Sequence, residues 1–196
     1  MRRAVKWFLL LGALAVILVV ASVWGYRFYM ERMYPIQYQE WVEQYSQEYG
    51  VPKSLVYSVI RSESSFRPDA ESSVGARGLM QITEQTFQWA QMRHNLTEET
   101  FDDLFDPQIN IRYGTYILSL LLEEFGSVQN ALCAYHAGWG VTQEWLADPE
   151  ITPDGTTITN IPYGDTRAYV RKVLDTQEIY RELYGIEDEN PGLQAN

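Results

Sequence analysis

One carboxylate, Glu63, has the sequence context of a catalytic acid. Val56, Val59 and Ile60 form the apolar stripe of a predicted helix, and Glu63 continues that stripe at position i+7. Burial penalises the charged form of a carboxyl and raises its pKa, so Glu63 could be protonated near neutral pH, as a general acid must be. Position alone also allows the alternative of a Glu at a helix end that points to water.

The segment after Glu63 is rich in small residues and ends in Gly-Leu-Met-Gln at position 81. Gly75 and Gly78 predict a tight turn and a close approach of the chain. The sequence has no Cys and His cluster with metal-ligand spacing and no Gly-rich phosphate loop, so we expect neither a metal nor a cofactor. His94 lies in a polar stretch that offers no partner ligand for His136.

Helix signals dominate the chain beyond its N-terminal part. A loop or small hairpin is expected from Asp148 to Pro162, where Thr, Pro and an Asp-Gly turn gather. We therefore expect a compact all-α domain whose cleft is formed by loops and contains Glu63. The helices are predicted from Ile36 to Tyr49, from Pro52 to Glu63, after the caps Thr83 and Thr97, from the cap Asp106 to Phe125, from the cap Ser127 to Tyr135, and from the cap Asp165 to Tyr184.

The N-terminal segment predicts a membrane anchor. Trp7–Trp24 is uncharged and long enough to cross the hydrocarbon of a bilayer. Basic residues precede it more densely than they follow it, so residues 1–6 are expected in the cytoplasm and the rest outside, on the periplasm or wall side. A cleaved signal peptide is the alternative, although no Ala-x-Ala triplet precedes a plausible cut.

This division of the chain gives five parts and limits the kinds of partner. Residues 25–35 form a stem, residues 36–185 a catalytic domain, and residues 186–196 an acidic, disordered tail. From Glu31 onward the formal net charge is −15, which argues against nucleic acid or anionic lipid as a partner through bulk charge. The only cysteine, Cys133, allows no intramolecular disulfide, so a packed core must supply the stability.

Four ordered blocks carry a resemblance to a known family. They are Glu63-Ser64, the run from Ala70 to Gln81, Ala134-Tyr135-His136-Ala137-Gly138, and the run from Ile161 to Val170. In order and spacing they resemble the signature of the lytic transglycosylases related to goose-type lysozyme, that is, the soluble-lytic-transglycosylase catalytic domain. The resemblance extends from about Gln39 to Tyr184 and implies a lysozyme-like fold.

The resemblance also implies a reaction and a substrate. The substrate would be the β-1,4 bond between N-acetylmuramic acid and N-acetylglucosamine in peptidoglycan, and the product a 1,6-anhydromuramoyl end. Glu63 would protonate the glycosidic oxygen and then, as a carboxylate, accept the proton of the muramoyl C6 hydroxyl. The substrate's acetamido group would stabilise the intermediate.

By motif position, several residues are expected to line the central subsites or to bond Glu63. The phenol of Tyr169 is expected to orient the acid. For each residue an ordinary structural role remains the alternative: core aromatic, core filler, turn residue or surface amide. The expected substrate-binding residues are Ser72, Met80, Gln81, Tyr135, Tyr163 and Tyr169.

Three further positions in the downstream blocks have open roles. His136 stands where the family has Asn; an imidazole does not reproduce the paired donor and acceptor of an amide, and it can also titrate. His136 and Trp139 are possible substrate contacts, with Trp139 stacking on a sugar as Tyr163 could. Arg167 could pair with a buried carboxylate or touch the substrate.

Two rival functions stay open. A hydrolytic goose-type muramidase would need a second carboxylate to position water, for which Asp69, Glu71 and Glu84 are near in sequence. A non-catalytic glycan-binding module of an envelope machine would keep the fold without the chemistry. The sequence identifies no protein partner.

Overall fold

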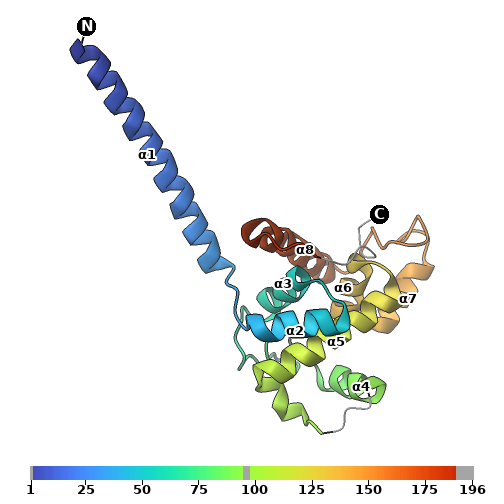
Figure 1. The fold of residues 1–196 in the computed structure, drawn as a ribbon. Coiled ribbons are helices and arrows are strands. Elements are labelled where there is room, and N and C mark those ends of the chain that lie inside the picture. The colour runs from blue at the N-terminus through green and yellow to red at the C-terminus, as the bar shows by residue number, and fades with distance from the viewer. Residues whose placement is uncertain (1, 95–97, 189–196) are drawn as a thin grey trace. The chain divides into compact units, whose positions relative to one another are not determined.

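The computed structural model describes residues 2–94 and 98–188, which fold almost entirely as helices (Figure 1). The chain divides into two compact units, residues 1–36 and residues 37–196. No strand forms among the described residues, where the only pairing is two isolated bridges that join Arg77 to Glu71 and to Ile82. The helices are α1 Arg2–Met33, α2 Gln39–Tyr49, α3 Lys53–Glu63, α4 Glu84–His94, the 3-10 helix η1 Phe101–Phe105, α5 Pro107–Phe125, α6 Val128–Ala137, α7 Trp139–Ala147 and α8 Gly164–Tyr184.

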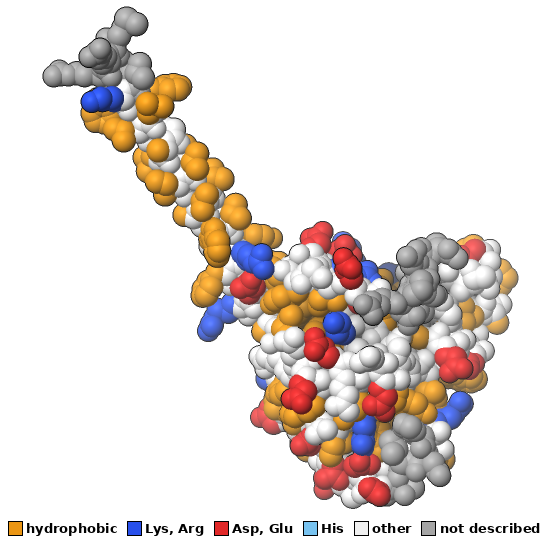
Figure 2. Space-filling view, viewed as in Figure 1, with side chains coloured by type: hydrophobic (Ala, Val, Ile, Leu, Met, Phe, Trp, Pro, Cys, Tyr) orange, Lys and Arg blue, Asp and Glu red, His pale blue; other side chains and the backbone are white. Residues whose placement is uncertain are grey.

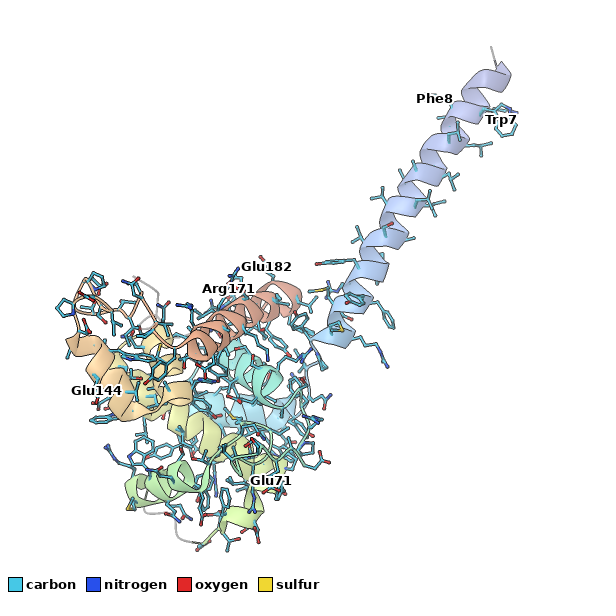
Figure 3. The ribbon with its side chains drawn as sticks, turned by 180° about the vertical axis from the view of Figure 1, so that it is seen from behind. Trp7, Phe8, Glu71, Glu144, Arg171 and Glu182 are labelled. Carbon is cyan, nitrogen blue, oxygen red and sulfur yellow. The ribbon has the colours of Figure 1, made fainter. Side chains whose placement is uncertain are left out.

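The first unit is the single helix α1. Its stretch Lys6–Met33, 28 residues, is long and apolar enough to cross a bilayer, and nearly all of its side chains are exposed. Trp7 and Phe8 project from this helix in Figure 3. The expected stem, residues 25–35, is helical as far as Met33, because no Gly or Pro after Gly25 interrupts the helix before Pro35.

The second unit has α5 at its centre. Helices α2, α6, α4 and η1 all pack against α5, and α8 packs on α3 and α6 (Figure 1). The wholly buried core includes Leu55, Ile60, Leu118, Leu132 and Val173 from these helices. Helix α3 is thus held between the rest of the bundle and α8, and its C-terminal end carries Glu63.

Most of the predicted helix ends are confirmed by their capping contacts. The Asp106 carboxylate accepts hydrogen bonds from two backbone N–H groups of α5, and Ser127 Oγ accepts one from Asn130. Gly50 and Gly126 end α2 and α5 in the left-handed conformation. Thr83 precedes α4 and accepts from the Thr86 N–H, whereas the expected cap Thr97 lies outside the described residues.

Three local predictions were wrong in detail. The N-cap of α8 is Tyr163, and Asp165 lies within the first turn, where its carboxylate accepts from the Thr166 N–H. Helix α6 ends at Ala137, two residues beyond the predicted Tyr135, because Gly138 breaks it, and the unpredicted α7 begins at once. Pro52 caps α3 instead of opening it.

The remaining differences concern the loops and the tail. The segment from Asp148 to Pro162 is a loop with no described strand pairing. At the C-terminus, Asp188 lies in the expected tail but is held in place, because its carboxylate accepts from Ser54 Oγ at 2.6 Å and pairs with Arg181 at 2.7 Å. The rest of the expected tail, residues 189–196, lies outside the described residues.

Candidate active site

Glu63 is the last residue of α3, and its neighbours fix the end of this helix. Val56, Val59 and Ile60 are fully buried, as the apolar stripe predicts. The next residue, Ser64, donates from Oγ to the Ile60 carbonyl at 3.2 Å and to the Leu79 carbonyl at 2.8 Å. This contact joins the end of α3 to the segment 77–81, the end of the run that the sequence singled out.

Burial dominates the electrostatics of the Glu63 carboxyl. It raises the pKa of Glu63 from 4.5 to about 7, although the Tyr169 hydroxyl and the charge of Lys172 both act in the opposite direction. Near neutral pH the side chain is therefore divided between acid and carboxylate. A group in that condition can both donate and accept a proton.

Two phenols adjoin this carboxyl. Tyr169 of α8 is buried, and its hydroxyl makes no standard hydrogen bond to another described residue, yet it lies close enough to Glu63 to favour the carboxylate. Tyr135 of α6 donates from its hydroxyl to the Met80 carbonyl at 2.7 Å. Burial and the Glu63 charge raise the pKa of both phenols well above 10, so both are neutral donors.

Segment 77–81 is held by a residue that the sequence analysis missed, Asn110 of α5. Its side-chain oxygen accepts from the Met80 N–H at 2.8 Å, and its nitrogen donates to the carbonyls of Leu104 at 2.8 Å and Arg77 at 3.0 Å. Asn110 is fully buried at the start of the apolar face that continues with Tyr113 and Ile117. An amide that interrupts such a face was the available signal.

The predicted residues of this segment have different placements. Met80 is fully buried against Gly114, so its side chain supports the site from beneath. The side-chain nitrogen of Gln81 donates to the carbonyls of Ala70 and Gly78. The backbone of Gln81, with φ of 49°, lies in the left-handed region. Ser72 makes a turn, because its Oγ accepts from the Ala76 N–H at 3.0 Å.

A groove of about 420 Å³ opens beside these residues, within the size range of ligand sites. Four predicted residues line it, namely Gln81, Tyr135, His136 and Trp139. Its other wall is α4 and the turn before it, which the sequence analysis did not single out. The lining from that wall is Ile82, Thr83, Gln85, Thr86 and Trp89.

The groove combines polar side chains with two indole rings, a surface suited to a sugar. The groove does not meet the expectation of a cleft that contains Glu63, because its lining lacks Glu63, Ser72, Met80, Tyr163 and Tyr169. Tyr163 is half exposed and packs edge-on against Trp145 at 5.0 Å. Arg167 donates to the Ile161 carbonyl at 3.0 Å and so stabilises the end of the loop before α8. No group of three or more metal-type side chains occurs among the described residues.

His136 contacts two residues of α8. Its Nδ1 lies 3.0 Å from Thr166 Oγ1, and its ring stacks on Tyr169 at 4.5 Å between centroids. Burial lowers the pKa of His136, and the nearby Asp165 carboxylate only partly opposes this. The neutral imidazole therefore supports the phenol that adjoins Glu63.

A family comparison decides what kind of domain this is. Residues 40–155 match the family model described as the transglycosylase SLT domain, which covers more than half of the chain. The chain belongs to this family. In this SLT domain, Glu63 and the segment 77–81 lie inside the matched region, whereas Tyr169 and Lys172 of α8 lie beyond it.

Named relatives agree with that assignment. The chain is 29% identical over 170 residues to the soluble lytic murein transglycosylase of Escherichia coli K12, covering 85% of this chain and 26% of that protein. It is 31% identical over 167 residues to the membrane-bound lytic murein transglycosylase C of Serratia proteamaculans, covering 74% of this chain and 47% of the relative. The chain thus spans between a quarter and a half of these relatives.

A solved structure shows the same fold for the SLT domain. The inactive Glu-to-Gln mutant of the lytic transglycosylase Slt from Pseudomonas aeruginosa aligns with a TM-score of 0.70 and 31% identity. The alignment covers 78% of this chain and 25% of that one. The lysozyme-like helical fold expected from the sequence is therefore confirmed.

The raised pKa of Glu63 predicts a pH-dependent change in the stability of the SLT domain. Since the folded-state pKa of about 7 exceeds the ordinary 4.5, deprotonation of Glu63 opposes folding as the pH rises through this window. The Glu63→Gln variant stays neutral. We expect it to be more stable than the parent by about 2 to 3 kcal/mol at pH 8 and equally stable at pH 4.

Thermal unfolding of both proteins at the two pH values measures this difference. The Glu71→Gln variant is the control, because Glu71 is exposed and pairs only at the surface with Arg77. A gain at pH 8 that also occurs at pH 4 would contradict a buried, titrating Glu63.

Proposed function

We propose that residues 37–188 act as a peptidoglycan lytic transglycosylase, with Glu63 as the single general acid and base. The observation that carries the proposal is the partly buried Glu63 carboxyl at the end of α3, next to the Tyr169 phenol, where burial raises its pKa to about 7. In the first step Glu63 donates its proton to the glycosidic oxygen as the bond from muramoyl C1 to that oxygen breaks. In the second step the Glu63 carboxylate accepts the proton of the C6 hydroxyl, whose oxygen bonds to C1.

The surroundings of Glu63 favour this two-step use of one acid. Neutral Tyr169 can orient the carboxyl without adding charge, and the His136 ring behind it limits its movement. Intramolecular attack by the C6 hydroxyl gains from a sugar held in place in a site with little water. The groove walls with Trp89 and Trp139 supply surfaces on which sugars could stack.

The hydrolytic alternative has less support. A muramidase mechanism would need a second carboxylate near the muramoyl C1. The described groups that act on the charge of Glu63 are Tyr169, Lys172 and Tyr135, none of which is a carboxylate. Glu71, labelled in Figure 3, instead pairs with Arg77 on the surface.

The products distinguish the two reactions. Purified peptidoglycan is incubated with the full chain in detergent, and the released muropeptides are analysed by mass spectrometry. A transglycosylase gives muramoyl ends that lack one water and resist borohydride reduction. Reducing muramic acid ends would show that the domain is a hydrolase and would contradict the proposal.

We further propose that α1 anchors this domain in the membrane, with residues 1–6 in the cytoplasm. The length and apolar exposure of Lys6–Met33 support an anchor, and a relative is named as membrane-bound. The many acidic side chains on the second unit (Figure 2) argue against attachment of that unit to anionic lipid by charge. Resistance to carbonate extraction, with residues 37–188 accessible to external protease in spheroplasts, is the expected result; release by carbonate would contradict the anchor.

A further inference from the structure

Lys172 of α8 makes a contact that the proposed mechanism has not yet used. It is one of only three lysines in the sequence. Its Nζ donates to the backbone carbonyl of Ser62 at 2.8 Å, the residue immediately before Glu63. The contact therefore joins α8 to the last turn of α3 at the position of the acid.

The last turn of α3 is an unfavourable place for a carboxylate. The carbonyl groups at a helix C-terminus have no partners within the helix and carry the negative end of its dipole. One of these carbonyls, that of Ile60, accepts hydrogen bonds from both the N–H and the Oγ of Ser64. Lys172 satisfies the Ser62 carbonyl and adds a positive charge from α8 to that of Arg61, which lies in the same turn.

The need for such a charge follows from the reaction. After Glu63 has protonated the leaving oxygen, its carboxylate must persist in a buried position until the C6 hydroxyl attacks. Tyr169 of α8 and Tyr135 of α6 also adjoin Glu63, but both phenols are neutral. Among the described residues, Lys172 is the one cation that acts on the Glu63 carboxyl.

Resting on the proposed role of Glu63, we propose that Lys172 is a positioning residue for the reaction. Through the Ser62 carbonyl it fixes the last turn of α3, and through its charge it stabilises the carboxylate form of Glu63. In this way Lys172 offsets part of the effect of burial and lets a single residue serve first as acid and then as base. Its direction of action on the pKa of Glu63, downward, agrees with this role.

The first experiment needs no catalysis. The full chain, labelled with ¹³C-glutamate and held in detergent micelles, is titrated by NMR, and the Glu63 signal is assigned with the Glu63→Gln variant. In Lys172→Met the Glu63 titration is expected to move to higher pH than in the parent. In Lys172→Arg, which keeps the charge and the donors, it is expected to stay close to the parent.

The neighbouring Arg171 gives a matched control. It lies on the same helix (Figure 3), is exposed, and pairs with Asp175 at 3.7 Å instead of reaching α3. Arg171→Met removes the same charge and is expected to leave the Glu63 titration unchanged. If Lys172→Met titrates like the parent, or if Arg171→Met shifts the titration equally, the inference fails, while the proposed function is left intact.

The second experiment measures activity against pH. For Lys172→Met we expect kcat to fall about three- to tenfold, and the alkaline limb of kcat/KM to move to higher pH. Lys172→Arg should restore both. A purely structural role would lower activity by the same factor at every pH and leave the limb in place, which would overturn the electrostatic part of the inference.

Discussion

Replacing Glu63 by Gln is expected to reduce the release of anhydromuropeptides by about 10³- to 10⁴-fold. The amide has nearly the shape of the acid, so the groove and the fold should be kept. It can neither donate an acidic proton to the leaving oxygen nor accept the proton of the C6 hydroxyl. Both steps of the proposed reaction therefore lose their catalyst with one substitution.

The assay is the initial rate of muropeptide release from purified cell walls, with the full chain in detergent. Glu71→Gln, which changes an exposed carboxylate near Glu63 in sequence, should stay within about twofold of the parent, because a surface ion pair contributes little. Equal rates for the parent and Glu63→Gln would mean that the domain is not catalytic, or that another group supplies the proton. That outcome would favour the glycan-binding module.

The local features of the site could be predicted from the sequence. The stripe of Val56, Val59 and Ile60 fixed the face of α3 on which Glu63 lies, because helical periodicity determines which residues share a face. Caps such as Asp106 and Ser127 were found because a side-chain oxygen can bond free N–H groups only at a helix start. These are short-range effects, and a sequence expresses them directly.

The contacts between distant segments could not be predicted. Asn110 and Lys172 form hydrogen bonds with backbone carbonyl or N–H groups. Nearly all residues carry these same backbone groups, so the sequence does not indicate which of them is the partner. The wall formed by α4, including Trp89, was missed for a similar reason, since only the packing of α4 against α5 brings it to the groove. The pattern therefore located Glu63 but not the distant residues that contact the end of α3 and the segment 77–81.

The cap of α8 illustrates a competition between local signals. Asp165 has the side chain of a good N-cap, yet the helix begins before it at Gly164. His136 bonds to Thr166 in the first turn, and Arg167 bonds back to the Ile161 carbonyl. Thr166 and Arg167 make these contacts from the first turn of α8, which begins before Asp165. The tertiary contacts therefore prevail over the local preference of Asp165 for the N-cap position.

Replacing Gly78 by Ala is expected to destabilise the domain by about 4 kcal/mol. A Cβ at this position would stand 2.1 Å from Asn110 Nδ2 and 2.2 Å from the Leu104 carbonyl oxygen, and φ is +74°. The methyl group would displace the amide that holds segment 77–81, so the Met80 and Arg77 contacts of Asn110 would be strained together. We expect the melting temperature to fall by roughly 10 °C.

Gly75 is the matched control, because its φ of +77° is nearly the same but a methyl group added there would meet no neighbouring atom within 4 Å. Gly75→Ala should therefore show only the backbone strain, about 1 to 2 kcal/mol. Thermal unfolding of the full chain in detergent, followed by near-UV circular dichroism, measures both. The difference between the two variants isolates the close approach of Gly78 to Asn110 and Leu104. Equal losses of stability would contradict that approach. A larger loss for Gly78→Ala would show that the segment 77–81 is supported through this approach, in which the Asn110 side chain takes part.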